Sequence, residues 1–127
     1  MGLLEEGKWV DRWYQTKDAG GRFVRKSASF RNWITSDGTA GPSGTSGFKA
    51  ERGRYHLYVS LACPWAHRTL ILRSLKGLES LISVSVVHWF MAGDGWTFEP
   101  AEDVIPDTIN GFKFLHQVYT AAAPNYS

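Results

Sequence analysis

The chain has 127 residues, enough for one domain of ordinary size, and its 43% hydrophobic and 20% charged residues exclude an intrinsically disordered protein. It contains no run of about 18 apolar residues, and its acidic start, MGLLEEGKW, is unlike a secretory signal, so we expect neither a membrane span nor a leader. The single cysteine, Cys63, rules out an internal disulfide and a zinc site built from several cysteines. We therefore expect a soluble, cytoplasmic protein.

The net charge of +2 is unevenly distributed along the chain. Residues 1–54 carry 10 bases and 6 acids, whereas residues 55–127 carry 4 bases and 6 acids. A basic surface can bind nucleic acid or small anions. No RNA-binding signature accompanies the basic cluster, so a solvated surface is the simpler interpretation and we expect no nucleic-acid partner. This cluster consists of Arg22, Arg25, Lys26 and Arg31, with Phe23 and Phe30 between them.

Residues 1–54 show little sustained periodicity, although tryptophans and phenylalanines are scattered through them. The run SDGTAGPSGTSG over residues 36–47 is typical of a loop, because glycine, serine and proline favour turns. We expect an irregular N-terminal arm over residues 1–54 that packs on a partner surface rather than folding alone.

A strand, a helix and a second strand are predicted from residue 55 onward. Alternation of apolar and polar residues predicts strands beginning at Tyr55 and over residues 81–87. Between them, Pro64 suits the first turn of a helix and Gly77 its C-terminal stop. An apolar stripe formed by Ile71, Leu75 and Leu78, widened by Leu70 and Leu72, should face inward. This βαβ pattern predicts parallel strands.

The rest of the chain is predicted to hold a loop and one further helix. Residues 88–106 read as a loop, and Asp107 is a candidate cap for a helix over about residues 110–122. Phe114, Leu115, Val118 and Ala122 should face inward. Because both faces of a two-stranded parallel sheet need covering, residues 55–127 look like the front part of a larger α/β domain.

Cys63 is the strongest candidate for chemistry. It follows a predicted strand and precedes a predicted helix, where free N–H groups and the positive end of the helix dipole stabilise a thiolate. His67 and Arg68 add positive potential, and such surroundings activate a cysteine. The alternatives are a buried structural cysteine and a metal site, which would require Cys63 and His67 to converge with histidines elsewhere, namely His56, His88 and His116.

A second thiol is missing from the Cys63 motif. In Cys-x-x-Cys proteins the second cysteine resolves a mixed disulfide, but the fourth position here is Ala66. A mixed disulfide on Cys63 would therefore need an external thiol. Glutathione is the abundant cytosolic candidate, and its carboxylates suit a basic helix N-terminus.

The stretch YHLYVSLACPWAHRT over residues 55–69, together with Gly95-Trp96-Thr97-Phe98, resembles the glutathionyl-hydroquinone reductases, or xi-class glutathione transferases. Phe30-Arg31-Asn32-Trp33 and the glycine-rich run after it resemble the arm of the same family. The resemblance implies a thioredoxin-like glutathione transferase N-terminal domain, here incomplete and preceded by an irregular arm.

The resemblance also implies a reaction and the residues that carry it. Cys63 would be the catalytic nucleophile that removes glutathione from glutathionyl-hydroquinones through a mixed disulfide, which a second glutathione resolves. Trp96, Pro64 and Trp65 would contact glutathione, and the Gly93-Asp94-Gly95 turn favours an exposed position for Trp96, which could otherwise be a core aromatic residue. Glutathione would be the co-substrate, without a metal, and the full-length parent would be a homodimer.

Several features of the resembled family have no counterpart in this chain. Family members continue into a loop with a cis-proline, a Glu-Ser pair that holds glutathione, and a helical domain with tyrosines that serve the hydroquinone. We therefore expect weak or no enzymatic turnover from these 127 residues. Two other hypotheses stay open: a glutaredoxin-like or dehydroascorbate-reductase-like glutathione enzyme, and an inactive fragment or interaction module.

Overall fold

A computed structural model describes residues 2–12, 17, 20–24, 27–42 and 44–127 of the protein. Contacts between residues divide them into two compact units, one formed by residues 2–12 with 56–127 and the other by residues 17–55. Residues 2–12 thus cluster with the C-terminal part of the chain. The division into a functional arm over residues 1–54 and a thioredoxin-like part over 55–127 stays a prediction.

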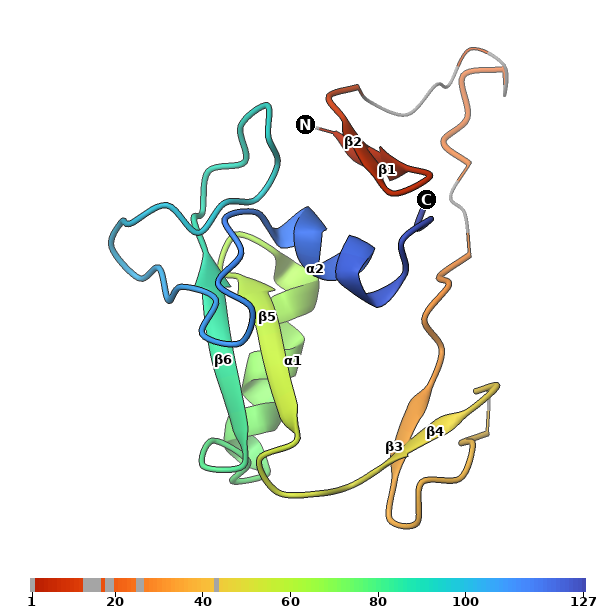
Figure 1. Ribbon diagram of the computed structural model, residues 1–127, viewed down its shortest axis with the longest axis vertical. Coiled ribbons are helices and arrows are strands. Elements are labelled where there is room, and N and C mark those ends of the chain that lie inside the picture. Colours follow the sequence, from red (N-terminus) through yellow and green to blue (C-terminus); the bar gives the residue numbers. More distant parts are fainter. Residues whose placement is uncertain (1, 13–16, 18–19, 25–26, 43) are drawn as a thin grey trace. The chain divides into compact units, whose positions relative to one another are not determined.

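The first unit is built around the predicted strand, helix and strand. They are β5 (Tyr55–Ser60), α1 (Pro64–Leu75) and β6 (Ile82–Val87), and β5 and β6 form a two-stranded sheet. Both strands run in the same direction, and α1 connects the end of β5 to the start of β6 (Figure 1). His56, the second residue of β5, makes side-chain hydrogen bonds of 2.6 and 2.8 Å to Ser83 and Ser85 of β6. The predicted βαβ unit is confirmed.

Helix α1 begins and ends where the sequence predicts. Pro64 occupies its first turn, where a missing N–H costs nothing. At its end, Gly77 adopts a φ of 64°, and its N–H donates to the Ser74 carbonyl at 2.9 Å. The N–H of Leu78 donates to the Arg73 carbonyl at 2.9 Å. This pair of bonds is a Schellman motif, which satisfies carbonyls that the last turn of a helix leaves open.

The predicted inward stripe of α1 is wrong for three of its residues. Leu75 is 76% exposed and Ile71 43% exposed, and Leu72 is also exposed. Within the part of the chain that the structure describes, no element covers this side of the helix. Arg73 is partly buried, and its Nε–H donates to the Ile82 carbonyl at 2.7 Å.

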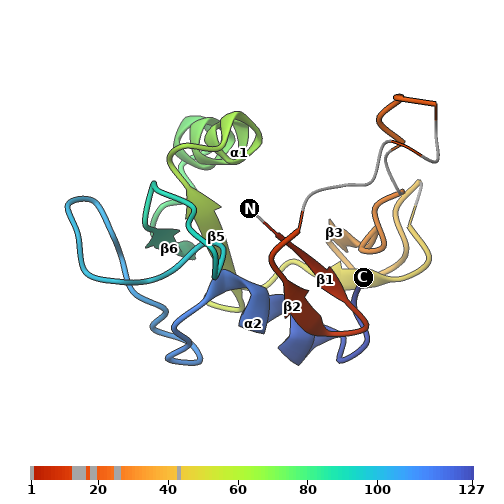
Figure 2. The same ribbon diagram turned by 90° about the horizontal axis from the view of Figure 1, so that it is seen from above.

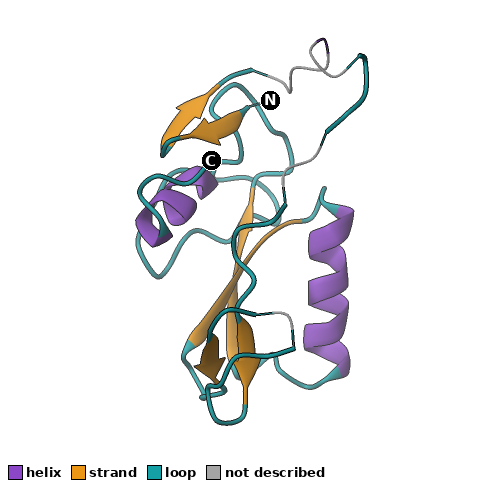
Figure 3. Cartoon of the chain, turned by 90° about the vertical axis from the view of Figure 1, so that its right-hand side faces the viewer, coloured by secondary structure: helices purple, strands orange, loops and turns teal. Residues whose placement is uncertain are grey.

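The opposite face of the sheet is covered by the segment that leads into α2 (Leu115–Ala122). Helices α1 and α2 lie on opposite sides of β5 and β6 (Figure 2, Figure 3). Ser85 is fully buried, and its hydroxyl donates to the Pro106 carbonyl at 2.8 Å. Val86 and Ile105 exchange two backbone hydrogen bonds of 2.9 and 3.0 Å. This segment is therefore attached along β6.

Asp107 holds the turn before α2 rather than the helix itself. Its carboxylate accepts backbone N–H groups of Ile109, Asn110 and Phe112 and, at 2.8 Å, the Tyr58 hydroxyl. Burial disfavours the charged carboxylate, but these hydrogen bonds prevail and lower the pKa of Asp107. Burial and the hydrogen bond to Asp107 raise the pKa of Tyr58 to about 12.

Helix α2 starts five residues later than predicted, so the prediction of a helix from residue 110 capped by Asp107 is wrong. The side-chain oxygen of Gln117 accepts the backbone N–H groups of Lys113 and Phe114 at 3.1 and 3.0 Å. It thereby caps the helix from its first turn, as the glutamine of a capping box does. Ala122, predicted to face inward, is exposed.

An N-terminal hairpin completes the first unit. Strands β1 (Leu3–Glu5) and β2 (Lys8–Val10) pair antiparallel, and Glu6 and Gly7 connect them with φ values of 47° and 77°. Two positive φ values in a two-residue loop match the twist of a hairpin. The Gly7 N–H donates to the Tyr126 carbonyl at 2.9 Å, so the turn also holds the C-terminal segment.

The second unit contains a short parallel pair, β3 (Trp33–Thr35) and β4 (Gly47–Lys49). The glycine-rich loop between these strands packs against the Trp33 ring, because a Cβ at Gly41 or Gly44 would overlap the indole. Arg22 and Arg31 of the basic cluster are exposed, whereas Arg25 and Lys26 lie outside the described residues. Within the described residues of the segment predicted to be irregular, two small paired elements therefore occur, the β1–β2 hairpin and the β3–β4 pair.

Substitution of Gly7 by alanine should destabilise the first unit strongly. Its positive φ costs an L-residue roughly 1–2 kcal/mol, and the new Cβ would overlap the Pro124 carbonyl oxygen, adding about 1–3 kcal/mol of overpacking. Gly111→Ala is the matched control, since Gly111 has a φ of 70° with nothing near its Cβ position. Urea denaturation of both variants tests this; equal losses of unfolding free energy would contradict it.

Candidate functional site

Cys63 occupies the N-cap position of α1, as predicted. Its backbone is extended, with φ −98° and ψ 113°, and its side chain makes no capping hydrogen bond. Its N–H donates to the Ser60 carbonyl at 3.1 Å, and its carbonyl accepts the His67 N–H at 3.1 Å. The backbone is thus fixed on both sides of a thiol that is only partly buried.

The first turn of α1 presents unused hydrogen-bond donors beside this thiol. Pro64 has no N–H, and the N–H groups of Trp65 and Ala66 have no partner among the described residues. Such groups carry the positive end of the helix dipole and stabilise a nearby anion. Cys63 is therefore a partly exposed cysteine at a helix start and not a structural cysteine sealed in a core.

Pro64 and Trp65 lie on the surface next to Cys63. Trp65 is 63% exposed, and the Arg68 guanidinium lies 4.9 Å from the centroid of its ring. This cation–π contact orients an open indole and a positive charge on the same side of the helix start. Both groups are available to a ligand that carries carboxylates.

Trp96 lies in the loop after β6 and is partly buried rather than on the exposed perch that the sequence suggested. Its carbonyl accepts the N–H of Leu115, the first residue of α2, at 2.9 Å. The next residue, Thr97, accepts the His88 N–H at 2.8 Å. The backbone of Trp96 and Thr97 is therefore held between the end of β6 and the start of α2.

Cys63 and Trp96 follow the carboxyl ends of two parallel strands, which meet at one end of the sheet (Figure 1). Ligands of open α/β sheets bind at this end. No hydrogen bond joins the two residues in the described part of the chain. The start of α1 carries Cys63, and the loop after β6 carries Trp96.

Tyr119 of α2 is coupled electrostatically to Cys63, which the sequence did not indicate. Burial raises the pKa of the Tyr119 hydroxyl, and the charges of Tyr126 and Cys63 add to this effect. Only the fold of the first unit reveals this coupling, because 56 residues of sequence separate Tyr119 from Cys63.

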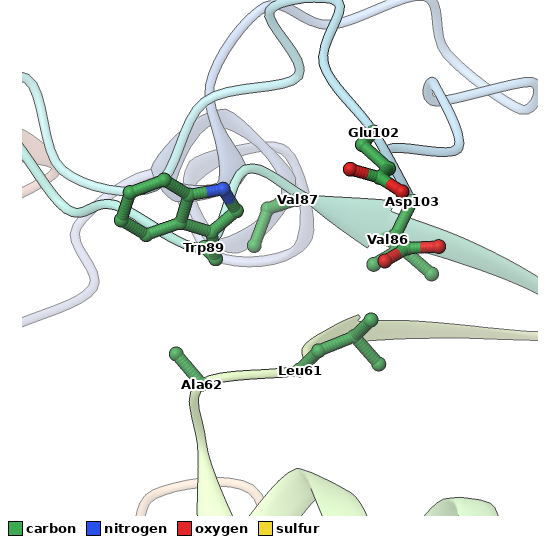
Figure 4. Close-up of a pocket in the computed structure, with 7 residues that line it drawn as sticks. All are labelled: Leu61, Ala62, Val86, Val87, Trp89, Glu102 and Asp103. Carbon is green, nitrogen blue, oxygen red and sulfur yellow. The ribbon is translucent and has the colours of Figure 1, made fainter.

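A cavity of about 300 Å³ lies beside the turn that carries Cys63 (Figure 4). Its walls are mainly apolar, with two carboxylates on one side. Cys63 and Trp96 do not line it, so the cavity is a neighbour of the candidate site rather than part of it. The lining residues are Leu61, Ala62, Val86, Val87, Trp89, Glu102 and Asp103.

The histidines do not converge on Cys63, which leaves the zinc alternative unsupported. His56 is engaged by two serines, His88 accepts the Phe90 N–H at 3.0 Å, and His116 lies in an aromatic stack. Among the described residues, no group of three or more His, Cys, Asp or Glu side chains is arranged to hold a metal.

The stack around His116 connects the N-terminal hairpin to α2. The His116 ring lies between Trp9, at 5.1 Å and 14°, and Phe114, at 5.2 Å and 7°. Burial lowers the pKa of His116 below its ordinary 6.5, and the charge of Asp94 opposes this shift. The stack is therefore formed by a neutral imidazole at neutral pH.

Comparison with known proteins gives close relatives along the whole chain, although no family model matches. The sequence is 58% identical over 128 residues to the glutathionyl-hydroquinone reductase YqjG of Escherichia coli K12 and 55% identical over 127 residues to PcpF of Sphingobium chlorophenolicum. All of this chain is covered in both comparisons, but it spans only 39% and 37% of these relatives.

Two solved structures share the fold. Glutathione-bound YqjG matches with a TM-score of 0.80 and 51% identity, over 98% of this chain and 35% of that one. A xi-class glutathione transferase from Natrialba magadii matches with a TM-score of 0.78 and 42% identity, over 99% of this chain and 35% of that one. The α/β fold is therefore that of the N-terminal part of xi-class glutathione transferases, as predicted. No helix in the described residues has the length and apolarity to cross a membrane.

Acidification should destabilise the protein through His116. Because the pKa of His116 is lower in the folded state, the unfolded chain binds more protons below about pH 6.5 and the unfolding free energy decreases as the pH falls. His116→Phe keeps a flat ring in the stack and cannot titrate. Urea denaturation at about pH 7.5 and 5.0 should show a smaller loss for this variant than for the wild type; equal losses would argue against the assignment.

Proposed function

We propose that this chain, which belongs to the glutathionyl-hydroquinone reductase or xi-class glutathione transferase family and matches the N-terminal part of its members, binds glutathione and carries the reactive cysteine of a glutathione-dependent reductase. The observation that carries the proposal is Cys63 at the N-cap of α1, beside two N–H groups without a partner in the described structure. The identity to two named reductases supports glutathionyl-hydroquinones as the substrate class.

In the first step the Cys63 thiolate attacks the sulfur that joins glutathione to the hydroquinone ring. The new bond is a disulfide between Cys63 and glutathione, and the carbon–sulfur bond breaks. The electron pair of that bond stays on the ring carbon, which takes up a proton and leaves as free hydroquinone. The free N–H groups of the first turn stabilise the attacking anion.

In the second step a further glutathione thiolate attacks the glutathione sulfur of the mixed disulfide. Oxidised glutathione forms and the Cys63 thiolate leaves, regenerated. The external thiol is needed because Cys63 is the only cysteine of the sequence. Overall, the two glutathione sulfurs lose two electrons when they form the disulfide, and the hydroquinone ring gains these two electrons.

Glutathione itself would be held by the surface around the thiol. Trp65 with Arg68 presents an open ring and a cation, and the helix N-terminus attracts a carboxylate. Pro64 shapes this turn without using a donor, and Trp96 would pack against the tripeptide from the adjoining loop. In the whole protein we expect a cytoplasmic homodimer, by analogy with the family.

A single reaction of Cys63 with its substrate tests this function and does not require efficient catalysis. Mixing the protein with glutathionyl-hydroquinone should release free hydroquinone and add one glutathione to Cys63, in equal amounts by chromatography and mass spectrometry. Cys63→Ser keeps the shape of the site but replaces the thiolate with a poor nucleophile, so its release rate should fall by at least about 100-fold.

One control variant decides how the result is interpreted. Ser60→Ala removes a neighbouring hydroxyl that accepts the Ala62 N–H without touching the thiol, and it should keep the reaction. Hydroquinone release that persists in Cys63→Ser, or a wild-type protein that stays unmodified, would remove the proposed function.

A further inference from the structure

Trp9 of the N-terminal hairpin makes specific contacts with the loop that carries Trp96. Its indole Nε1–H donates to the Gly93 carbonyl at 2.7 Å. Its ring lies against Gly95, where a Cβ would come within 2.8 Å of the Trp9 Cη2 atom. Gly95 also has a φ of 79°. The loop is therefore shaped to pass over this ring directly before Trp96.

The same ring contacts the other group that fixes Trp96. Trp9 stacks on His116, the second residue of α2. The first residue of α2, Leu115, donates its N–H to the Trp96 carbonyl at 2.9 Å. Trp9 thus touches Gly95, the residue before Trp96. It also touches His116, which follows the residue whose N–H binds the Trp96 carbonyl.

We propose that Trp9 is a positioning residue for glutathione binding: it holds the Trp96 loop and the start of α2 in the arrangement that lets Trp96 pack against glutathione. This inference rests on the proposed function, because it assigns Trp96 the glutathione contact. The contacts of Trp9 are with Gly93, Gly95 and His116, so its role would act through them.

The hairpin has other attachments, so a conservative change at Trp9 acts locally. The Gly7 N–H donates to the Tyr126 carbonyl at 2.9 Å, and the Glu6 N–H donates to the Ser127 hydroxyl at 2.7 Å. Leu4 is buried at 8% exposure. Trp9→Phe would keep an aromatic ring for His116 and lose the hydrogen bond to Gly93, while these other contacts persist.

The test compares two disulfides that react with Cys63 by the same exchange. The thiolate attacks one sulfur of the disulfide, the sulfur–sulfur bond breaks, and the other half leaves as a thiolate. Oxidised glutathione offers the tripeptide to the site, whereas dithiobis(nitrobenzoate) does not. Trp9→Phe should lower the rate constant with oxidised glutathione roughly 3- to 10-fold, since a misplaced binding group holds the reacting atoms less well in position. The rate constant with dithiobis(nitrobenzoate) should stay within about twofold of the wild-type value.

The Trp96→Ala background shows whether the effect passes through Trp96. There, adding Trp9→Phe should change the glutathione rate by less than about 1.5-fold, because the effects of residues coupled through a shared backbone segment are not additive. Trp89→Phe, at an exposed indole outside the site, is the matched control and should react like the wild type. Gly95→Ala perturbs the same contact from the loop side and should reproduce the selective loss.

Each other outcome has a defined meaning. Any of three results would overturn the positioning role. The rate constants could fall equally with both disulfides, or they could stay unchanged in Trp9→Phe and Gly95→Ala. Alternatively, Trp9→Phe could lower the rate constant in the Trp96→Ala background as much as it does in the wild type. A Trp9→Phe protein that unfolds, with Gly95→Ala folded and unaffected, would overturn it as well. A wild-type protein that reacts no faster with oxidised glutathione than its Trp96→Ala variant does would instead refute the glutathione site itself, and this inference with it.

Discussion

The start of helix α1 is the constraint on which the site depends. A proline at the first position removes one N–H, a cysteine takes the place where an oxygen-bearing cap is usual, and the next two N–H groups find no partner in the described structure. The side chain of Cys63 makes no capping hydrogen bond itself. Ser60 and His67 hold the Cys63 backbone on either side, so the residue is held at the positive end of the helix dipole.

Support for this helix start comes from both ends of the chain. Strand β6 and the turn held by Asp107 fix the opposite face of the sheet, and α2 brings Tyr119 within electrostatic reach of the thiol. The N-terminal hairpin adds the Trp9 contacts with the loop and with His116. A single strand-to-helix turn is therefore surrounded by segments that are far apart in sequence.

The sequence predicted those parts of the fold that local chemistry decides. The alternation in residues 55–60 and 82–87, Pro64 and Gly77 each act within a few residues, and the structure agrees with them. Features that depend on long-range packing were missed or wrong. Asp107 binds a turn and Tyr58 rather than α2, and Leu75 stays exposed because nothing in the described chain covers it. The roles of Trp9 and Tyr119 likewise needed the tertiary contacts.

The most direct measurement of whether the fold activates Cys63 is its alkylation rate with iodoacetamide at neutral pH, in the folded protein and in urea. A neutral reagent that is not glutathione isolates the effect of the helix start from ligand binding. The proposed site predicts a folded-state rate at least about tenfold above the unfolded one, since the thiolate is the reactive form. A folded-state rate equal to or below the unfolded one would contradict an activated thiol at this position.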